Sequence, residues 1–220
     1  MSAPAPERGR SEPLLRPDFE SASALLAAAF FTNPAHVYLF PDEQKRRRSL
    51  QWLLRRNLEN QDPLEHSFCV AEAPDGPERR ILAMGFWHAP EAPTLSVRGL
   101  LQPSLLALPF RCGLDATRRV FEVTRLLEKD RWAAIGPAWF LNNMVVDERL
   151  RGSGVGTQLL AQELRLRVDP SGQPAALATQ RPENVVFYRR LGFEVASERL
   201  LGSRSHPFRN WIMIRAAQGS

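Results

Sequence analysis

The sequence predicts a mixed α/β (α+β) layer fold, in which helices cover both faces of a mixed β-sheet. Its C-terminal half alternates strand-like apolar runs with amphipathic helical repeats, in the order β-α-β-α-β-β. Its composition, with 44% hydrophobic and 24% charged residues among 220, is that of an ordinary globular protein. The longest apolar run, Ala24 to Phe31, has eight residues, whereas a membrane span needs roughly 20.

Hydrophobic periodicity and turn residues place the individual elements. Helices are expected where apolar residues recur every three or four positions, and strands where β-rich runs are bounded by turn residues. The expected elements are a helix opening at Pro17 and Asp18 and broken at 33–42, a helix at 42–60, strands at 67–72 and 80–88 around a turn at 74–77, a helix at 115–132, a strand at 139–146, a helix at 154–168, a strand at 175–179, a short helix at 184–191, and strands at 193–200 and 211–215.

A flexible tail is expected at residues 1–13, followed by a single domain over 14–220. The tail lacks the apolar core of a secretory signal, and Cys69 and Cys112 fit no metal or redox spacing, so we expect a cytoplasmic protein with two buried thiols. The net charge is +5, and the densest cationic cluster, residues 45–48, falls on a helix with an apolar stripe of leucines. We therefore expect a solvated helix face there, with no specific nucleic-acid partner, no membrane partner and no metal site.

The segment Arg151-Gly152-Ser153-Gly154-Val155-Gly156 carries the most chemical information. Glycines at alternate positions let the backbone approach a ligand, and the free N–H groups at the start of a helix suit a phosphate or pyrophosphate. The dinucleotide fingerprint fails because Thr157 stands where its third glycine is required, and no Gly-Lys-Ser/Thr of a P-loop follows. The segment thus predicts an anion-binding turn, with a plain flexible turn as the alternative.

Two motifs in the C-terminal half resemble those of the GNAT superfamily of N-acetyltransferases. The string from Val146 to Gly156 is similar to its acetyl-CoA-binding motif, [Q/R]-x-x-G-x-[G/A] after a strand, and the string Asn184 to Phe193 is similar to its N-x-x-x-Y-x-x-x-G-F segment. The resemblance covers about 139–215. Looser matches to a branch that includes puromycin N-acetyltransferase-like proteins are Arg16-Pro17-Asp18, Asn33-Pro34, Phe40-Pro41-Asp42 and Trp139-Phe140-Leu141.

The resemblance implies a GNAT-type sheet in which the strand before the turn separates from its neighbour at a bulge and holds acetyl-CoA as cosubstrate. An amine attacks the thioester carbonyl, an oxyanion forms, and the coenzyme leaves as a thiolate. The catalytic groups that it implies are the backbone N–H of Met144, facing the oxyanion, and Tyr188, the acid at the leaving sulfur. The cofactor-binding residues that it implies are Met144, Val145, Val146, Arg151, Gly152, Ser153, Gly154, Val155, Gly156, Thr157, Asn184, Phe187 and Tyr188.

Several assignments stay open at this point. Tyr188 has an alternative as a core aromatic, and Asn184 either contacts the pantetheine arm or caps its helix. Phe140 stands where some relatives have a glutamate, which puts a direct carboxylate base on that strand in doubt. The remaining candidates for the general base are Glu72, His88, His36 and His206.

The leading interpretation is an acetyl-CoA-dependent N-acetyltransferase that acts on a small primary amine. The alternatives are a protein or peptide N-acetyltransferase and a non-catalytic module that binds CoA or nucleic acid; a homodimer is left open. The acceptor side is expected to come from the N-terminal helices, the insertion at 89–130 and the connection at 201–210. The aromatic residues expected to line an enclosed pocket there are Phe30, Phe31, Tyr38 and Phe208.

Overall fold

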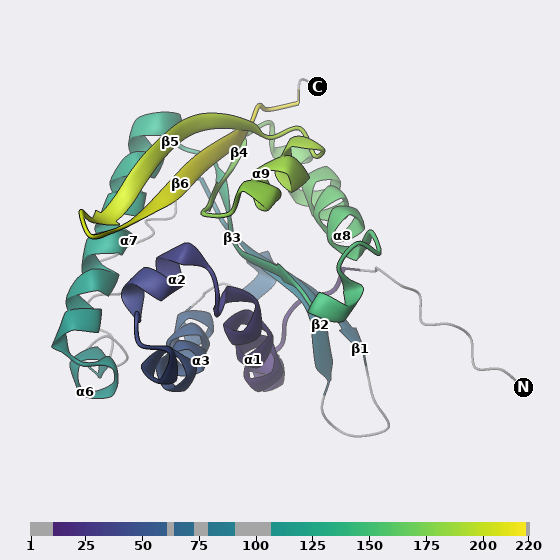
Figure 1. Ribbon diagram of the computed structural model, residues 1–220. Helices are drawn as coiled ribbons and strands as arrows, with labels where there is room; N and C mark the ends of the chain where they lie inside the picture. The colour runs from purple at the N-terminus through teal and green to yellow at the C-terminus, as the bar shows by residue number, and fades with distance from the viewer. Residues whose placement is uncertain (1–10, 61–63, 73–78, 91–106, 219–220) are drawn as a thin grey trace, which may run out of the picture.

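A six-stranded mixed sheet forms the centre of the computed structural model, which describes residues 11–60, 64–72, 79–90 and 107–218 (Figure 1). The strand order is β1-β2-β3-β4-β6-β5. Only β3 and β4 run parallel, and the other neighbours are antiparallel. The predicted mixed α/β fold is therefore confirmed. The strands are β1 (Ser67–Glu72), β2 (Arg80–His88), β3 (Trp139–Val146), β4 (Ala175–Thr179), β5 (Glu194–Ser203) and β6 (His206–Arg215).

Helices cover both faces of the sheet (Figure 1). On one face, α8 (Val155–Glu163), the π-helical segment η4 (Leu164–Val168) and α9 (Pro182–Arg189) share a core with the strands. On the other face lie the N-terminal helices and a long helix inserted between β2 and β3. The elements of that face are η1 (Arg16–Asp18), α1 (Phe19–Phe30), α2 (Pro34–Leu39), α3 (Glu43–Glu59), α6 (Leu108–Cys112) and α7 (Leu114–Ile135).

The apolar stripe expected on the helix after the glycine turn is confirmed. All five of its members are buried in the core between α8, η4, α9 and the sheet. Because they anchor the helix from its first residue onward, the start of α8 is held against the strands that precede it. These residues are Val155, Leu159, Leu160, Leu164 and Val168.

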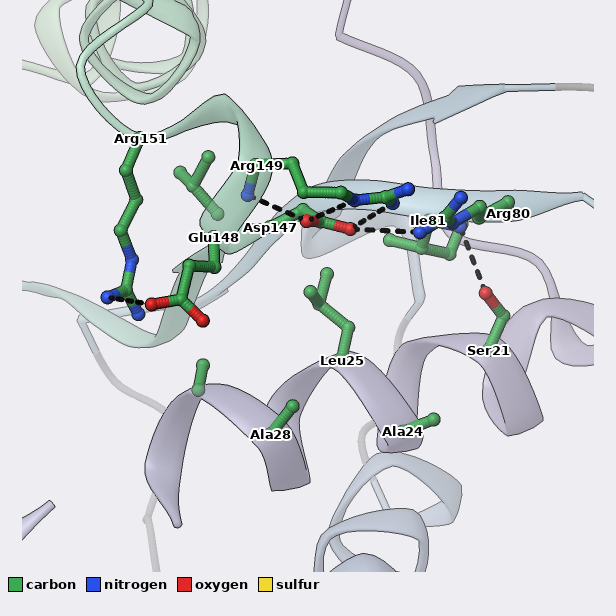
Figure 2. Close-up of a pocket in the computed structure, with 12 residues that line it drawn as sticks. Ser21, Ala24, Leu25, Ala28, Arg80, Ile81, Asp147, Glu148, Arg149 and Arg151 are labelled. Atoms are coloured by element: carbon green, nitrogen blue, oxygen red, sulfur yellow. Dashed lines mark hydrogen bonds and ion pairs between the residues drawn. The ribbon is translucent and has the colours of Figure 1, made fainter. Parts of the chain in front are cut away.

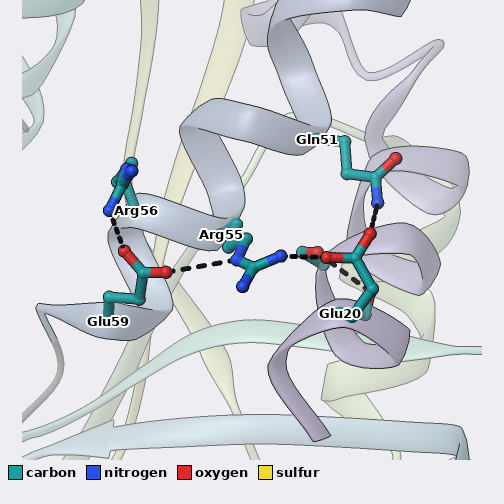
Figure 3. Close-up of polar contacts among 6 residues, drawn as sticks. Glu20, Gln51, Arg55, Arg56 and Glu59 are labelled. Atoms are coloured by element: carbon teal, nitrogen blue, oxygen red, sulfur yellow. Dashed lines mark hydrogen bonds and ion pairs between the residues drawn. The ribbon is translucent and has the colours of Figure 1, made fainter. Parts of the chain in front are cut away.

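Polar contacts fix α1 between α3 and the sheet. Glu20 on α1 accepts hydrogen bonds from Gln51 Nε2 (2.9 Å) and from Arg55, both on α3, and Arg55 also pairs with Glu59 (Figure 3). On the opposite side of α1, the backbone N–H of Ile81 donates to the side chain of Ser21 (3.0 Å). Helix α1 is thereby held beside β2.

Two details of the N-terminal helices correct the sequence-based expectations. The segment 33–42, expected to be a break, contains α2, because Asn33 caps the helix by accepting from Ala35 N (2.9 Å) and Pro34 is its first residue. Arg46, expected on a solvated face, is only 7% exposed and donates to the carbonyl of Phe40 (2.6 Å). The Arg46 guanidinium thus supplies a hydrogen-bond donor to a carbonyl at the end of α2, where the helix itself provides no backbone donor.

Residues 11–13, which we expected to belong to a flexible tail, are placed beside the sheet. The backbones of Glu12 and Cys69 exchange hydrogen bonds, so residues 11–13 lie against β1, whereas residues 1–10 are outside the described part of the chain. The turn expected at 74–77 and much of the insertion at 89–130, residues 91–106, are also outside it. Cys69 and Cys112 are buried free thiols, as predicted.

Element boundaries differ from expectation mainly at the C-terminal end. The final hairpin is longer than predicted, since β5 extends to Ser203 and β6 begins at His206. Among the described residues, no helix combines the length and the apolar character needed to cross a bilayer.

Candidate active site

A bulge interrupts β3 at the two asparagines of its apolar run. Asn142 pairs with Phe86 and Val145 with Met84, so two residues of β3, Asn143 and Met144, stand opposite one residue of β2. Asn143 has a φ of 55°, and it is the one non-glycine residue with positive φ in the described part of the chain. Asparagine tolerates this left-handed conformation better than most residues, and such bulges re-aim the backbone beside binding sites.

Strands β3 and β4 are paired only over their first half. The pairs run from Trp139 with Ala175 to Leu141 with Leu177, and then stop. Strand β3 continues to Val146 and β4 to Thr179 without further pairing between them. The backbone edge of β3 around the bulge is therefore unpaired on the β4 side, as the family resemblance implies.

The glycine turn follows β3 directly and leads into α8. Gly152 (φ 79°) and Gly154 (φ 86°) have positive φ, and a Cβ at either would meet no atom within 4 Å. Gly154 is the N-cap of α8 and supplies no capping side chain, so the first N–H groups of the helix are not satisfied from that position. Ser153 donates its hydroxyl to the carbonyl of Leu150 (2.6 Å), which fixes the turn from within.

Gly156 marks the point where three predicted segments meet. A Cβ on Gly156 would lie 2.9 Å from Val146 Cγ2, 3.8 Å from Phe187 Cζ and 3.9 Å from Met144 Cε. The end of β3, the first turn of α8 and α9 are thus brought together. The small residue of the motif at this position has a packing reason, because a Cβ would require Val146 or α8 to shift and a larger side chain would press α8 away from β3.

Arginine and carboxylate side chains surround the turn on the α1 side. Asp147 accepts a bidentate contact from Arg149 (3.0 and 2.7 Å) and a contact from Arg80 (3.3 Å), and Glu148 pairs with Arg151 at 3.6 Å. A pocket of about 410 Å³ lies between these residues and α1 (Figure 2). Its α1 wall consists of small and apolar residues, namely Ser21, Ala24, Leu25, Ala28 and Ala29.

The pairs around this pocket differ in strength. Arg149 and Arg80 are engaged by a carboxylate that is only 14% exposed. The Arg151–Glu148 pair has exposed side chains, 54% and 84%, and such pairs contribute little to stability. Arg151 can therefore leave Glu148 for a stronger anion at low cost, whereas Arg80 and Arg149 share the more buried carboxylate of Asp147.

Tyr188 is buried on α9, with a relative exposure of 7%. Its ring contacts those of Phe187 and Phe193, with centroids 5.0 and 5.9 Å away, and burial raises the pKa of its hydroxyl well above the ordinary value. The hydroxyl is therefore protonated throughout the physiological range and can donate a hydrogen bond.

Asn184 does not cap α9. Arg181 occupies the N-cap position, and the amide of Asn184 instead donates to the hydroxyl of Thr179 (3.1 Å), at the last residue of β4. The capping alternative for Asn184 is therefore wrong. The contact fixes α9 to the end of β4, beside the unpaired edge of β3.

The four candidates for the general base lie in different places. Glu72 ends β1, and His206 is exposed at the start of β6. His36 on α2 stacks on Phe30, with ring centroids 5.0 Å apart, and burial lowers its pKa to about 4. Only His88 contacts β3, through the amide nitrogen of Asn142, which lies 3.3 Å from its Nε2.

The aromatic residues expected in one acceptor pocket are divided between two cores. Phe30 and Phe31 pack against the core of α1 and α3, whereas Tyr38 and Phe208 pack against each other, with centroids 5.5 Å apart, in the core of α2 and α7. The single aromatic pocket that we expected from these four residues therefore stays a prediction, because they pack in two separate cores. Within the described residues, no group of three or more His, Cys, Asp or Glu side chains is arranged to hold a metal ion.

The glycine turn and the bulged strand lie in the part of the chain that matches a known family. Residues 118–195, which span α7 to the start of β5, match the family described as the acetyltransferase (GNAT) domain. This segment, which contains β3, the glycine turn and α9, therefore resembles a GNAT acetyltransferase domain, and the match supports an acetyltransferase activity.

Solved structures of acetyltransferases share the whole fold. The protein described as histone acetyltransferase HPA2 and related acetyltransferase from Corynebacterium glutamicum is 17% identical, with 96% of this chain and 97% of that chain covered and a TM-score of 0.61. Arylalkylamine N-acetyltransferase 2 from Aedes aegypti is 16% identical, with 95% and 99% covered and a TM-score of 0.59. Polyamine N-acetyltransferase from Drosophila melanogaster is 13% identical, with 94% and 99% covered and a TM-score of 0.58.

Proposed function

We propose that the protein transfers an acetyl group from acetyl-CoA to the primary amine of a small molecule. One observation carries this proposal. The unpaired edge of β3 at the Asn143–Met144 bulge leads along the chain into the glycine turn at the start of α8. The edge can offer N–H groups to a thioester and the turn can offer N–H groups to a pyrophosphate, so one continuous stretch of backbone fits both parts of the ligand.

The residues around this stretch fit acetyl-CoA. The turn has open space beside Gly152 and Gly154, and a helix start favours a negatively charged group. Arg151 is exposed and weakly paired, so it can add a charge-assisted contact to a phosphate. The turn from Gly152 to Thr157 would hold the pyrophosphate, and the unpaired edge from Met144 through Val145 to Val146 would hold the pantetheine arm.

Bound acetyl-CoA supplies an activated acyl group whose carbonyl oxygen becomes negative when the amine attacks. The bulge turns the peptide of Met144 out of the regular ladder with β2, and its N–H is proposed to donate to that oxygen. A fixed backbone donor needs no reorganisation during the reaction. The apolar side chains of the strand can therefore remain in the core while the backbone does the chemistry.

Tyr188 is proposed to stabilise the leaving sulfur by hydrogen bonding. Because burial raises its pKa, full proton transfer from the phenol to a thiolate of pKa about 8.5 is unfavourable. A hydrogen bond from the neutral hydroxyl disperses the thiolate charge without that transfer. The nitrogen loses one proton to water as the amide forms, and the CoA thiolate takes up one proton from water after the product separates.

A small amine is preferred over a peptide as the acceptor. The Aedes and Drosophila structures described above are those of an arylalkylamine and a polyamine N-acetyltransferase. On this chain, α2 is fixed over the end of β4 by side-chain amides, with Asn33 donating to Gln180 (3.2 Å) and Gln180 donating to Asn210 (2.8 Å). These contacts leave less room for an extended peptide. The puromycin N-acetyltransferase-like branch stays a prediction.

The cofactor assignment is tested by thermal unfolding with and without CoA. A ligand at about 100 times its Kd adds roughly 2.7 kcal/mol, which raises the melting temperature of a protein of this size by about 5 to 11 °C. If millimolar CoA leaves the melting temperature unchanged, the assignment of CoA as the ligand is wrong.

The acceptor class is tested by release of free CoA thiol in the presence of primary amines. The panel comprises phenethylamine, agmatine, spermidine, puromycin, free amino acids and short peptides. Turnover of small amines with no turnover of peptides supports the proposal. Turnover of peptides alone supports a protein N-acetyltransferase, and CoA binding without any turnover supports a non-catalytic module.

A further inference from the structure

His88 and Asn142 form a polar pair at the point where β3 and β4 separate. Leu141 is the last residue of β3 that pairs with β4, and Asn142 is the next. The amide nitrogen of Asn142 lies 3.3 Å from Nε2 of His88 on β2. At about 3.3 Å of rise per residue, Asn142 lies within about 7 Å along the strand of the Met144 peptide.

The side chains of this pair lie on the face of the sheet that carries the acceptor-side helices. Phe140 and Asn142 are two residues apart on a regular stretch of β3 and so share a face. The guanidinium of Arg131 on α7 lies 4.4 Å above the ring of Phe140, which places α7 over this face. The opposite face carries Leu141 into the core under α8.

The hydrogen bond sets the orientation of the Asn142 amide. An amide nitrogen can only donate, so Nε2 of His88 accepts and carries no proton. The imidazole is neutral at neutral pH, because burial and the nearby charge of Arg131 lower the pKa of His88 to about 4. With its Nδ2 engaged by His88, Asn142 has its Oδ1 as the side-chain atom that can accept a hydrogen bond from a ligand.

We propose that Asn142, oriented by His88, positions the acceptor amine for attack by accepting a hydrogen bond from its N–H. This inference rests on the proposed function and names the acceptor as an unprotonated primary amine. Such a nitrogen has two N–H groups and one lone pair, so one N–H can be held by Asn142 Oδ1 while the lone pair faces the thioester. Asn142 binds the amine, and His88 is a positioning residue.

The arrangement also accounts for Phe140 at the position where some relatives have a glutamate. A neutral amide does not remove a proton from an ammonium ion, and a histidine of pKa about 4 is a poor acceptor for it. The ammonium proton is therefore lost to water before the amine is bound. The pair then holds the nitrogen that has lost this proton.

The test uses the full-length protein with phenethylamine and with agmatine, and compares Asn142→Ala, His88→Leu and His88→Gln. We expect Asn142→Ala and His88→Leu to raise the KM for both amines about 3- to 10-fold, the effect of one hydrogen bond. The KM for acetyl-CoA and the thermal shift with CoA should stay unchanged. His88→Gln, whose side chain can again accept from Asn142, should restore the wild-type KM.

Several outcomes would overturn the inference. An unchanged amine KM in Asn142→Ala does so, as does His88→Gln behaving like His88→Leu, or an equal rise in the KM for acetyl-CoA. Asn142 and His88 lie on different strands. If the variant at one position fails to fold, the variant at the other position still tests the inference. If the wild-type protein acetylates neither amine, the small-amine function fails together with the inference; if it acetylates them and Asn142→Ala does so equally well, only the inference fails.

Discussion

The two faces of the sheet are built from different kinds of chemical group. On the α8 and α9 face, the groups proposed to bind the cofactor are backbone N–H groups made accessible by glycines between Gly152 and Gly156. On the α1, α2 and α7 face, the groups near the proposed reaction centre are side chains from distant segments, such as His88 on β2 and Asn142 on β3. Backbone sites depend on local spacing, whereas side-chain sites depend on the tertiary arrangement.

This difference predicts different effects for substitutions on the two faces. A backbone site keeps its chemistry when neighbouring apolar side chains change, provided that the glycines remain. A side-chain site changes its specificity with single substitutions. We expect mutations on the first face to abolish cofactor binding and mutations on the second face to alter the acceptor or the rate.

The largest expected effect is at Gly154. Replacement by valine places a β-branched residue at φ 86°, a conformation that costs such residues heavily, and turns the first N–H groups of α8 away. We expect Gly154→Val to abolish the thermal shift with CoA while the protein stays folded. Gly172→Val is the matched control, because Gly172 (φ 64°) has the same open surroundings but lies outside the turn; loss of the shift in both variants would contradict the assignment.

The next effect is at Tyr188, on the same face. Tyr188→Phe keeps the ring contacts with Phe187 and Phe193 and removes only the hydroxyl. We expect kcat to fall by about 10- to 10⁴-fold with little change in acetyl-CoA affinity. Wild-type turnover at saturating acetyl-CoA, with chemistry rate-limiting, would mean that Tyr188 is a core aromatic only.

A smaller effect is expected at the bulge that joins the two faces. Asn143→Val disfavours the φ of 55° and should flatten the bulge, misplacing the Met144 N–H and lowering kcat by about 10²-fold. Asn143→Gly retains the conformation and should keep most of the activity, although it loses the contact of Asn143 with Asn57 (3.3 Å). Equal kcat values for the two variants would show that catalysis does not depend on the conformation of the bulge.

The smallest effect concerns stability on the acceptor face. His36 has its pKa lowered from 6.5 to about 4 by burial, so the unfolded chain binds a proton between these values and the folded chain does not. Stability is therefore lost as the pH falls from about 6.5 to 4, by about 2 to 3 kcal/mol for this group. Urea unfolding at pH 7 and pH 4.5 should show a smaller loss for His36→Phe, which preserves the stack on Phe30.

The sequence predicted the cofactor face more fully than the acceptor face. The stripe from Val155 to Val168 and the order of helices and strands along the C-terminal half followed from periodicity. The helix α2 was missed although Asn33-Pro34 is itself a start signal, with a capping residue followed by a proline at the first helical position.

Other features depend on contacts that no local pattern contains. In the sequence, Arg46 cannot be distinguished from the exposed arginines beside it, because its burial depends on the position of the Phe40 carbonyl in the folded chain. The pairing of His88 with Asn142 follows from the register of β2 and β3 around the bulge. The roles of Met144 and Tyr188 came from the family resemblance and remain to be tested by the variants above.

The connection between β2 and β3 has a consequence for the order of folding. These strands are antiparallel neighbours, yet the 50 residues 89–138 separate them. Each doubling of a loop costs about 0.6 kcal/mol of closure entropy, so joining them costs about 2 kcal/mol more than a short hairpin would. Helix α7, whose backbone hydrogen bonds are local, can form first, and the β2–β3 register that creates the bulge is fixed late. Refolding kinetics should therefore show acetyl-CoA binding appearing after helical structure.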